Sequence, residues 1–503
     1  MKEILLFGAG KSATVLIDYL LEQASTENWH VTVVDANLKL AKEKIGSSAN
    51  GTGASFDIND DSVRQTYVQK ANIVISLLPP ALHFLVAKDC LAFKKNLLTA
   101  SYVDEQMRSL QRDIENNGLL FLCEMGLDPG IDHMSAKKMI DEIHAEGGVI
   151  TSFLSHCGGL VAPESDDNPW HYKISWNPRN VVNAGKAGAI FKFNGETLSL
   201  NYEMLFAEKR MVQIPDYGVL CWYPNRDSLS YIPAYGLDEC ATFIRTTLRH
   251  PDFIYGWHNL IELKLTDDTE TYETDGLSLS EFFQQHLTKH GFSNWLQQKL
   301  QEQFENAKEL LNNLSNLLQL EEEVKEAGQK PVEEFMVVND HGNLEEVGID
   351  DVKTNAASVV AQTMHESNAT LKQLIYLGLD DDDTIINKGR ASAADVLLFT
   401  LEKKLALQPH EKDLIVMLHE LEYELHGKKY KRTSSLVTTG KDAQHTAMAK
   451  TVGLPLGIAA KLILNDSIQL KGLHIPILPQ VYNAVLPELE KQGIVFKEIT
   501  TAL

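Results

Sequence analysis

Two short segments carry the residues whose types and spacing point to chemistry. The first, residues 7–13, reads Phe-Gly-Ala-Gly-Lys-Ser-Ala, and the second, residues 124–133, reads Glu-Met-Gly-Leu-Asp-Pro-Gly-Ile-Asp-His. The first segment fits Gly-x-Gly-x-x-Gly/Ala: Gly8 allows a tight turn, Gly10 lets the backbone approach a pyrophosphate, and Ala13 lets a helix pack closely on a strand. The second segment offers carboxylates and an imidazole, which can accept protons or bind an ammonium group. Together they predict a dinucleotide enzyme with an amino-acid substrate.

Asp35 indicates which dinucleotide binds. It ends the second predicted strand, where a carboxylate accepts hydrogen bonds from ribose hydroxyls and repels a 2′-phosphate. The sequence therefore favours NAD and makes NADP the less favoured cofactor. An aspartate that only ends a strand and starts a turn is the structural alternative. The other cofactor contacts predicted from motif and strand ends are Ala9, Lys11, Ser12, Asp57, Leu77 and Leu78, of which the two leucines could equally belong to the core.

Short apolar runs alternate with amphipathic helical segments over the N-terminal part of the chain, a pattern typical of βαβ units and a parallel sheet. Apolar residues at helical spacing directly after the glycines predict a helix over 13–24. The predicted strands cover residues 3–7, 30–34, 52–56, 73–77, 96–99 and 119–122. We expect an α/β fold whose first domain, residues 1–127, is a Rossmann dinucleotide-binding domain.

The second domain should be an α+β substrate domain with a mixed sheet, built from residues 128–278 and 406–503. The sequence predicts a helix over 134–144 and a strand over 149–154. Glu420, Glu422 and Glu424 alternate with apolar residues ahead of a glycine, which predicts a hairpin with one solvated face. Helices predicted over 443–464 and 487–492 could pack back on the first domain.

Residues 279–405 should form a mostly helical subdomain inserted into the second domain. Leucines recur over 310–320, but for too few heptads to favour a coiled coil over an ordinary helical subdomain. The acidic run over 380–383 lacks the glycine-punctuated spacing of a cation loop, so we expect a solvated boundary between helix and loop.

Composition limits the classes of partner. The 46 Lys and Arg against 69 Asp and Glu give a net charge of −23, which disfavours nucleic acid and anionic membrane surfaces. An anionic substrate would need arginines in a local pocket. The five cysteines lack zinc-type spacing, so we expect no metal site and a reduced, cytoplasmic compartment. The apolar residues before Gly8 predict a strand in preference to a signal peptide, and no window approaches the ~20 apolar residues of a membrane span.

Six motifs in one order resemble the glutamate-forming saccharopine dehydrogenases. A seventh match, over 446–455, resembles that family's C-terminal helix, and the resemblance is weakest between about 284 and 405. The six motifs cover residues 75–79 (Ile-Ser-Leu-Leu-Pro), 98–102 (Leu-Thr-Ala-Ser-Tyr), 126–133, 157–160 (Cys-Gly-Gly-Leu), 223–228 (Tyr-Pro-Asn-Arg-Asp-Ser) and 247–249 (Thr-Leu-Arg).

The resemblance implies the NAD-linked oxidation of saccharopine with water to glutamate and 2-aminoadipate 6-semialdehyde, a step of lysine degradation. It implies that saccharopine lies in the cleft between the two domains, and it adds Ser101, Leu127 and Asp128 to the expected cofactor contacts. The residues that match the family's substrate contacts are Ser101, Tyr102, Asp128, Arg226, Thr247, Leu248 and Arg249.

The chemistry of saccharopine agrees with these residue types. Its three carboxylates suit the forked donors of Arg226 and Arg249, although either arginine could instead form an ordinary surface ion pair. Its ammonium groups suit Asp128. Only a neutral secondary amine can release the hydride, so a proton acceptor is needed, and the candidate catalytic residues are Asp128, Tyr102 and His133. His133 could instead pack and order the preceding loop. Cys157, at the end of a predicted strand, is a further neighbour of the substrate.

Other functions stay open at this stage. One is an NADP-linked saccharopine reductase working in lysine biosynthesis, and another is a carboxyspermidine-type condensing dehydrogenase, which predicts acidic residues where Arg226 and Arg249 stand. A non-catalytic NAD-binding scaffold should have lost the residues of the substrate cleft. A homodimer could form through an exposed edge of the second-domain sheet.

Overall fold

The computed structural model describes residues 1–326, 334–338 and 344–503. Backbone contacts divide the chain into two compact units, each described by itself. The first unit holds residues 1–167, 171–251 and 405–503, and the second holds residues 168–170 and 252–404. The second unit thus begins well before the predicted boundary at residue 279.

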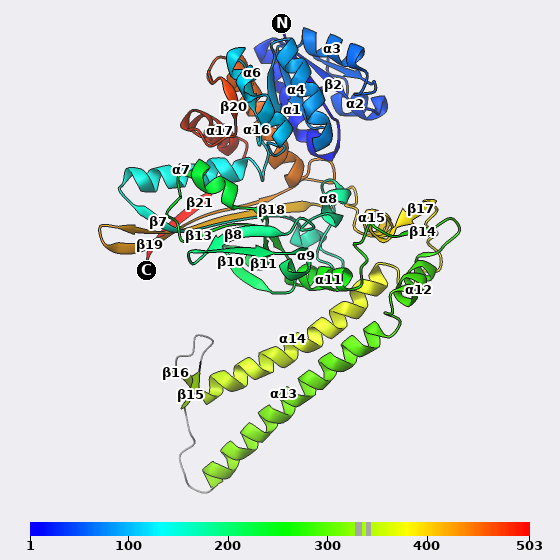
Figure 1. The fold of residues 1–503 in the computed structure, drawn as a ribbon, viewed down its shortest axis with the longest axis vertical. Helices are drawn as coiled ribbons and strands as arrows, with labels where there is room; N and C mark the ends of the chain where they lie inside the picture. Colours follow the sequence, from blue (N-terminus) through cyan, green and yellow to red (C-terminus); the bar gives the residue numbers. More distant parts are fainter. Residues whose placement is uncertain (327–333, 339–343) are drawn as a thin grey trace. The chain divides into compact units, whose positions relative to one another are not determined.

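A parallel sheet with the strand order β20-β6-β5-β4-β1-β2-β3 forms the nucleotide-binding part of the first unit (Figure 1). The six predicted strands are confirmed, each end lying within two residues of its predicted position. The strand β20 comes from the far end of the chain and pairs with β6, which the sequence did not reveal. The strands are β1 (Lys2–Phe7), β2 (Trp29–Val34), β3 (Gly51–Ala54), β4 (Ile73–Ser76), β5 (Asn96–Thr99), β6 (Leu120–Leu122) and β20 (Gly472–His474).

Helices cover this sheet, and one of them, α16, comes from the C-terminal part of the chain, with α17 packed on α16. Gly453 and Gly457 of α16 lie against Leu16 and Tyr19 of α1, where an added Cβ would come within 2.9 Å or less of their side-chain atoms. The late helix α16 therefore packs on α1 of the Rossmann domain. The helices are α1 (Thr14–Glu27), α2 (Leu38–Ile45), α3 (Asp61–Lys70), α4 (His83–Ala92), α5 (Glu105–Ser109), α6 (Gln111–Asn116), α16 (Ala447–Leu464) and α17 (Pro479–Lys491).

The apolar character of α16 follows from this burial. Within the described residues, it is the one helix long and apolar enough to cross a membrane by length and composition. However, 78% of its 18 residues are buried inside the protein, as expected for the core helix of a globular domain. The prediction that no apolar window approaches the length of a membrane span overlooked this helix.

A large mixed sheet forms the rest of the first unit. Its main path runs β10-β11-β13-β7-β18-β19-β21, and β13 pairs with β7 in parallel while β18 pairs with β7 and β19 antiparallel. The predicted hairpin is thus confirmed as β18 and β19. The strands are β7 (Val149–Val161), β8 (Ala189–Phe193), β9 (Glu196–Leu200), β10 (Arg210–Ile214), β11 (Gly218–Pro224), β12 (Arg226–Asp227), β13 (Thr242–Arg249), β18 (Asp413–Leu425), β19 (Lys428–Thr439) and β21 (Lys497–Ala502).

The strand β7 runs seven residues beyond its predicted end at residue 154, which places Cys157 inside the strand. Glycines usually weaken a strand, but an added Cβ on Gly158 would lie 2.7 Å from Leu248, so the absence of a side chain allows close packing there. The long helix α7 (Ile131–Ala145) packs on β7, and the short helices of this part are α8 (Pro178–Val182), α9 (Tyr202–Leu205) and α10 (Ile232–Tyr235).

The second unit is mostly helical, as predicted. Gly291, with φ +77°, lies between α12 and α13 and separates the two helices. A capping box of Ser278 and Glu281 starts α12. The helices are α11 (Pro251–Glu262), α12 (Leu279–Lys289), α13 (Trp295–Glu326), α14 (Ile349–Tyr376) and α15 (Ala393–Lys404), with the short strand pairs β14 (Thr271–Glu273) with β17 (Arg390–Ser392) and β15 (Glu334–Val338) with β16 (Leu344–Gly348).

The acidic run over 380–383 lies after α14 and serves structure. Asp381 pairs with Lys404 at 2.9 Å, and Asp382 accepts a hydrogen bond from Ser280. These contacts tie the turn to neighbouring helices. They agree with the predicted helix-to-loop boundary.

Candidate active site

The turn between β1 and α1 has the shape that a dinucleotide pyrophosphate requires. Gly8 has φ +100°, and an added Cβ would lie 2.9 Å from the carbonyl oxygen of Leu77, so glycine is needed there. An added Cβ on Gly10 meets nothing within 4 Å, which leaves open space above the turn. Lys11 and Ala13 bound the single 3₁₀ turn that leads into α1. This arrangement fits the phosphates of a dinucleotide at a helix N-terminus.

Asp35 is fixed beside this turn. Its Oδ2 accepts a hydrogen bond from the Ala9 amide at 2.8 Å, and its Oδ1 accepts one from the Asn37 amide at 2.8 Å. The side chain is half-buried. A carboxylate held in this way at the end of β2 can accept hydrogen bonds from a ribose. Its bond to the Asn37 amide also stabilises the turn after β2, so the structural alternative holds too.

Lys44 adds a cation that the sequence motifs did not point to. Its ammonium donates to the Gly10 carbonyl and to the Thr14 hydroxyl, the latter at 2.7 Å. Burial lowers the pKa of Lys44 to about 8, although Asp18 and Asp35 act in the opposite direction. Local sequence patterns do not predict this contact, because it depends on how α2 packs beside the glycine turn.

The other predicted cofactor residues lie in varied surroundings. Asp57 is exposed and accepts hydrogen bonds from the Asn59 amide and side chain, as in an Asx turn. Leu77 and Leu78 are half-buried after β4, so each packs on the core and keeps an exposed part. Leu127, in contrast, is only 4% exposed and belongs to the core.

Ser101 lies at the end of a buried polar chain. The His83 ring bonds to the Ser76 hydroxyl through Nδ1 and to the Ser101 hydroxyl through Nε2, both at 2.8 Å. Burial lowers the pKa of His83 to about 4, so the imidazole is neutral at pH 7. One ring nitrogen donates and the other accepts, which orients Ser101 toward the end of β5.

The second motif builds a cluster of buried charges. Arg245 Nη2 lies 2.6 Å from Asp128 Oδ1 and 2.8 Å from Asp132 Oδ2. Asp132 also accepts a hydrogen bond from the Gly130 amide at 2.6 Å. Gly130 has φ +149°, and an added Cβ would overlap Gly126, so only glycine allows the loop to bring Asp128 and Asp132 together.

Aromatic rings and a second arginine surround Asp128. Tyr102 donates a hydrogen bond to Asp128 Oδ1 at 3.3 Å. The Arg226 guanidinium lies 5.2 Å from the centre of the Tyr102 ring, and Arg226 itself is exposed, so it can reach a ligand. Arg245 lies over the Tyr231 ring at 4.5 Å. The structure thus brings Tyr102, Asp128 and Arg226 together, as the sequence predicted.

His133 lies behind this cluster, with no exposed surface. Its Nδ1 bonds to the Tyr235 hydroxyl at 2.5 Å, and its Nε2 bonds to Glu124 at 2.8 Å. Both ring nitrogens are occupied, so His133 does not touch a substrate in this arrangement. The geometry supports the alternative in which His133 orders the loop that carries Asp128.

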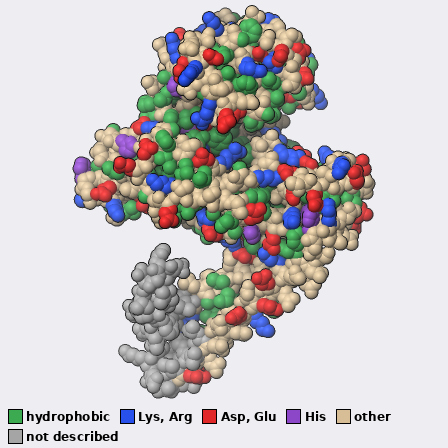
Figure 2. Space-filling view, in the orientation of Figure 1, with side chains coloured by type: hydrophobic (Ala, Val, Ile, Leu, Met, Phe, Trp, Pro, Cys, Tyr) green, Lys and Arg blue, Asp and Glu red, His purple; other side chains and the backbone are tan. Residues whose placement is uncertain are grey.

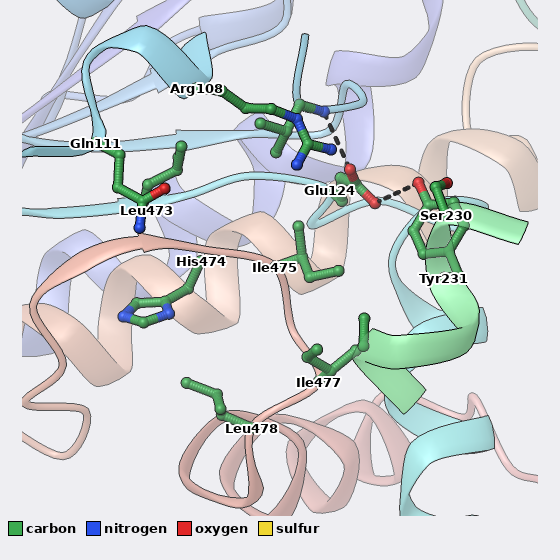
Figure 3. A pocket seen from close by; sticks show the side chains of 12 residues that line it. Arg108, Gln111, Glu124, Ser230, Tyr231, Leu473, His474, Ile475, Ile477 and Leu478 are labelled. Carbon is green, nitrogen blue, oxygen red and sulfur yellow. Dashed lines mark hydrogen bonds between the residues drawn. The ribbon is translucent and has the colours of Figure 1, made fainter. Parts of the chain in front are cut away.

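Glu124, which bonds to His133, also lines a cavity of about 260 Å³ (Figure 3). Its carboxylate accepts hydrogen bonds from the Val103 amide at 3.0 Å and the Tyr231 hydroxyl at 3.1 Å. Arg108 lies on the same side, and the opposite wall is apolar, with Ile475 and Ile477 (Figure 3).

Electrostatics separates the roles of the acidic groups. Burial and the nearby Asp132 raise the pKa of Asp128 to about 6, against the opposing effect of Arg245. Burial also acts to raise the pKa of Asp132, but His133, Arg245 and the Gly130 amide together lower it below its usual value. Burial raises the pKa of Tyr102 far above its usual range. Tyr102 is therefore a proton donor in hydrogen bonds, which argues against its predicted role as a base.

The remaining predicted residues, Thr247, Leu248 and Arg249, lie on two different faces of the strand β13. Because side chains alternate along a strand, Arg245, Thr247 and Arg249 share one face. Leu248 points the other way and is fully buried in a separate apolar cluster, so only its backbone is near the site.

Cys157 of β7 pairs in register with Thr247 of β13, so the two side chains lie on the same face of the sheet. The thiol is buried, and this burial, with Asp128 next, raises its pKa well above the usual value. Cys157 is thus a packing neighbour of the site and not an acid or a base.

Sequence reasoning missed Arg245, Asp132 and Glu124. Arg245 stands four residues before Arg249 in the sequence, and only the strand β13 shows that the two side chains share a face. Glu124 and Asp132 flank the recognised Asp128, but only the tertiary structure shows their partners.

The chain matches two family models at positions that agree with this geometry. The model for the saccharopine dehydrogenase NADP binding domain matches residues 4–122, and the model for the saccharopine dehydrogenase C-terminal domain matches residues 126–494. The chain belongs to the saccharopine dehydrogenase family. Its members are NAD(P)-dependent oxidoreductases, and the predicted resemblance is confirmed.

Relatives of this chain are similar to it over nearly its full length. The saccharopine dehydrogenase [NADP(+), L-glutamate-forming] of Pyricularia oryzae is 32% identical over 100% of this chain and 99% of its own. The protein of the same name from Saccharomyces cerevisiae is 31% identical over 100% of both chains. The alpha-aminoadipic semialdehyde synthase of Arabidopsis thaliana is 31% identical over 98% of this chain, which spans only 44% of that longer protein.

A solved structure has the same fold. The apo saccharopine dehydrogenase (L-Glu forming) from Saccharomyces cerevisiae matches with a TM-score of 0.78 and 29% identity, over 100% of both chains. This match confirms the predicted α/β fold, with a Rossmann domain followed by a mixed-sheet domain.

Proposed function

We propose that this protein oxidises saccharopine with a nicotinamide dinucleotide and water, giving L-glutamate and 2-aminoadipate 6-semialdehyde. The observation that carries the proposal is the buried cluster of Asp128 and Arg245, 2.6 Å apart, with Tyr102 and Arg226 beside it. Full-length similarity to proteins named for this reaction supports it.

The arginines of this site suit a substrate with three carboxylates. Arg226 is exposed near Tyr102, and Arg249 lies on the same face of β13 as Arg245. Guanidinium groups bind carboxylates through two parallel hydrogen bonds. In a chain of net charge −23, these cations supply the local attraction that the overall charge would oppose. On the face in Figure 2, Lys and Arg otherwise lie among Asp and Glu, with no continuous basic field over the described residues.

Asp128 is the best candidate for the group that removes the proton from the secondary amine. With a pKa of about 6, its carboxylate is mostly ionised at pH 7 and can still take up a proton. The hydrogen bond from Tyr102 and the ion pair with Arg245 fix its orientation. The Gly8–Gly10 turn would hold a nicotinamide dinucleotide, which would supply the hydride acceptor. Asp128 can then return its proton as water adds to the imine and the carbinolamine collapses.

Asp35 leads us to propose NAD as the preferred dinucleotide and, with it, the oxidative direction of lysine degradation. A carboxylate at the end of β2, already fixed by two amides, would repel a 2′-phosphate. The matching family model and the fungal relatives are named for NADP, which supports the NADP-linked biosynthetic alternative. The five free cysteines are all buried, which suits the reducing compartment that we propose.

The direct test is a saccharopine-dependent increase in absorbance at about 340 nm, where reduced nicotinamide absorbs, measured with NAD⁺ and NADP⁺ in parallel. Arg249→Ala should abolish turnover, whereas Arg112→Ala on the exposed surface of α6 should not change it. Turnover with NADP⁺ alone would overturn the argument from Asp35. No turnover with either dinucleotide, in a folded protein, would overturn the proposed reaction and favour a condensing dehydrogenase or a scaffold.

A further inference from the structure

The cavity beside Glu124 (Figure 3) is separate from the cluster of Asp128 and Arg245. Neither of these two residues lines it, and all of its lining residues belong to the first unit. Its volume of about 260 Å³ lies just below the range of about 300–1,000 Å³ for drug-sized ligands, so a molecule of the size of one amino acid fits. We call it the Glu124 cavity, and the residues that decide its chemistry are Arg108, Glu124, Tyr231, Leu473, Ile475 and Ile477.

Arg108 brings an unpaired cation to the Glu124 cavity. Its side chain is exposed and extends toward Glu124 (Figure 3). Within the described residues, the Arg108 guanidinium forms no hydrogen bond and no ion pair, so it is not paired with Glu124 although both line the same cavity. A guanidinium in this position can bind the carboxylate of a ligand through two parallel hydrogen bonds.

Glu124 supplies the opposite charge and keeps one acceptor position open. It is only 2% exposed, and in the described part of the chain it has no Lys or Arg partner. Its Oε1 accepts one hydrogen bond, from the Val103 amide, and its Oε2 bonds to both His133 and Tyr231. A carboxylate has about four acceptor positions, so one remains on Oε1. A buried carboxylate is costly without a partner, and the ammonium group of a ligand would provide one.

The other wall of the Glu124 cavity is apolar. Ile475 and Ile477 lie opposite the two charged side chains (Figure 3). The polar residues Gln111 and His474 are engaged within their own segments, because Gln111 donates to a glutamate one turn along α6 at 3.1 Å and the His474 ring bonds to the Lys471 carbonyl at 2.8 Å. Apart from the two charged residues above, no Asp, Glu, Lys or Arg lines this cavity. The wall therefore suits an uncharged, aliphatic group.

We propose that the Glu124 cavity binds a free aliphatic α-amino acid of the size of leucine. The ligand's carboxylate would bind to Arg108, its ammonium group to Glu124, and its side chain would pack on Ile475 and Ile477. Each feature of the cavity then meets one complementary group of the ligand. An amino acid with a charged side chain is disfavoured, because its additional charge would meet the apolar wall. The same argument excludes saccharopine, which carries three carboxylates.

Tyr231 joins the Glu124 cavity to the cluster of Asp128 and Arg245. Its hydroxyl donates a hydrogen bond to Glu124 at 3.1 Å, and the Arg245 guanidinium lies 4.5 Å from the centre of its ring. Arg245 in turn holds Asp128. A ligand that bonds to Glu124 therefore acts on the residues that position Asp128. On the basis of the proposed function, we expect bound leucine to change kcat/KM for saccharopine by about fivefold or more.

The test is a calorimetric titration of the full chain with L-leucine, 4-methylpentanoate and 3-methylbutylamine. The second compound is leucine without its amine, and the third is leucine without its carboxylate. Leucine should bind with a Kd between about 10 µM and 1 mM. Each analogue should bind about tenfold more weakly or worse, because it lacks one of the two charged contacts. Leucine binding should persist when saccharopine is present in excess, because the two sites are separate.

Two variants and two controls assign the site. Arg108→Gln removes the cation, and Ile475→Phe places a larger side chain in the cavity, so each should weaken leucine binding by about tenfold or more. Arg112→Gln is the matched control, because Arg112 is an exposed arginine that does not line the cavity. Arg226→Ala removes an exposed arginine of the candidate active site. Both controls should bind leucine like the wild type.

No binding of leucine up to about 10 mM overturns the proposal, and so does wild-type affinity in a folded Arg108→Gln variant, with folding checked by circular dichroism. Equal affinity for leucine and 4-methylpentanoate would overturn the role of Glu124. Loss of leucine binding in Arg226→Ala, or displacement by saccharopine, would overturn the separate site. Leucine that binds without changing kcat/KM would overturn the link through Tyr231. Binding is measured without turnover, so failure of the proposed reaction is distinguishable from failure of this site.

Discussion

Arg245 Nη2, on strand β13 of the mixed sheet, lies 2.6 Å from Asp128 Oδ1, in the loop between β6 and α7. Both side chains are largely buried, at 4% and 14% exposure. The guanidinium also holds Asp132, so a single cation orients two carboxylates. This pair fixes the position of the proposed base, and the predictions about activity follow from it.

Replacing Arg245 tests whether the cation positions Asp128. Arg245→Lys keeps the charge but loses the planar fork, so kcat/KM for saccharopine should fall by about 100-fold. Arg245→Gln leaves two buried carboxylates without their cation and should also destabilise the fold, by about 3–5 kcal/mol. Steady-state kinetics and thermal unfolding measure the two effects. Wild-type kinetics in Arg245→Lys would contradict the positioning role.

The pH dependence of kcat/KM should report the ionisation of Asp128. Because the carboxylate is the active form and its pKa is about 6, activity should fall as the pH drops through 6 and should be level above about 7. Removing the cation in Arg245→Gln favours the protonated acid, so the same fall should move to higher pH. In Asp128→Asn, this limb of the profile should disappear. A profile that is unchanged in Asp128→Asn would show that another group removes the proton.

The two glycines of the dinucleotide turn should behave differently. Gly8→Ala places a Cβ 2.9 Å from the Leu77 carbonyl at φ +100°, so the variant should lose thermal stability. Gly10→Ala meets no atom within 4 Å and should keep its stability, but its methyl group would occupy the approach of the pyrophosphate. Thermal unfolding and dinucleotide titration separate these effects. Tight dinucleotide binding by Gly10→Ala would show that the pyrophosphate lies elsewhere.

Asp35 should control the choice between NAD and NADP. Asp35→Ser removes the charge that repels a 2′-phosphate while keeping a hydrogen-bonding group, so the ratio of kcat/KM for NAD⁺ to that for NADP⁺ should fall by about tenfold or more. Asp113→Ser provides the control, because Asp113 is an exposed residue of α6 outside the candidate site. An unchanged ratio in Asp35→Ser would rule out this residue as the determinant.

Glu124 should matter for stability more than an exposed glutamate does. Glu124→Ala removes the acceptor of His133, Tyr231 and the Val103 amide, which leaves buried polar groups without their partner. We expect a loss of about 3 kcal/mol or more. Glu124→Gln, which keeps one oxygen, should lose less, and Glu105→Ala on the surface should lose almost nothing. Chemical denaturation measures all three.

Several positions could be predicted because the relevant physics is local. Gly8, Gly10 and Asp35 follow strands and open a turn, and strand periodicity places them without any knowledge of the rest of the chain. Asp128, Tyr102 and Arg226 were found through motifs, and the structure brings them together. The continuation of β7 past residue 154 was missed, because glycines interrupt the apolar pattern there, and one of them, Gly158, allows close contact with Leu248 of β13.

The sequence by itself determined the nucleotide-binding domain, the family and the residues at the centre of the site, since these depend on short-range spacing and on motifs. Only the tertiary structure decided that Arg245 pairs with Asp128, that Glu124 and His133 lie behind them, and that α16 and β20 complete the first domain. The Arg245–Asp128 pair and the β20–β6 pair each join residues more than a hundred positions apart in the sequence. They depend on how sheets and helices pack, and local sequence patterns carry no record of it.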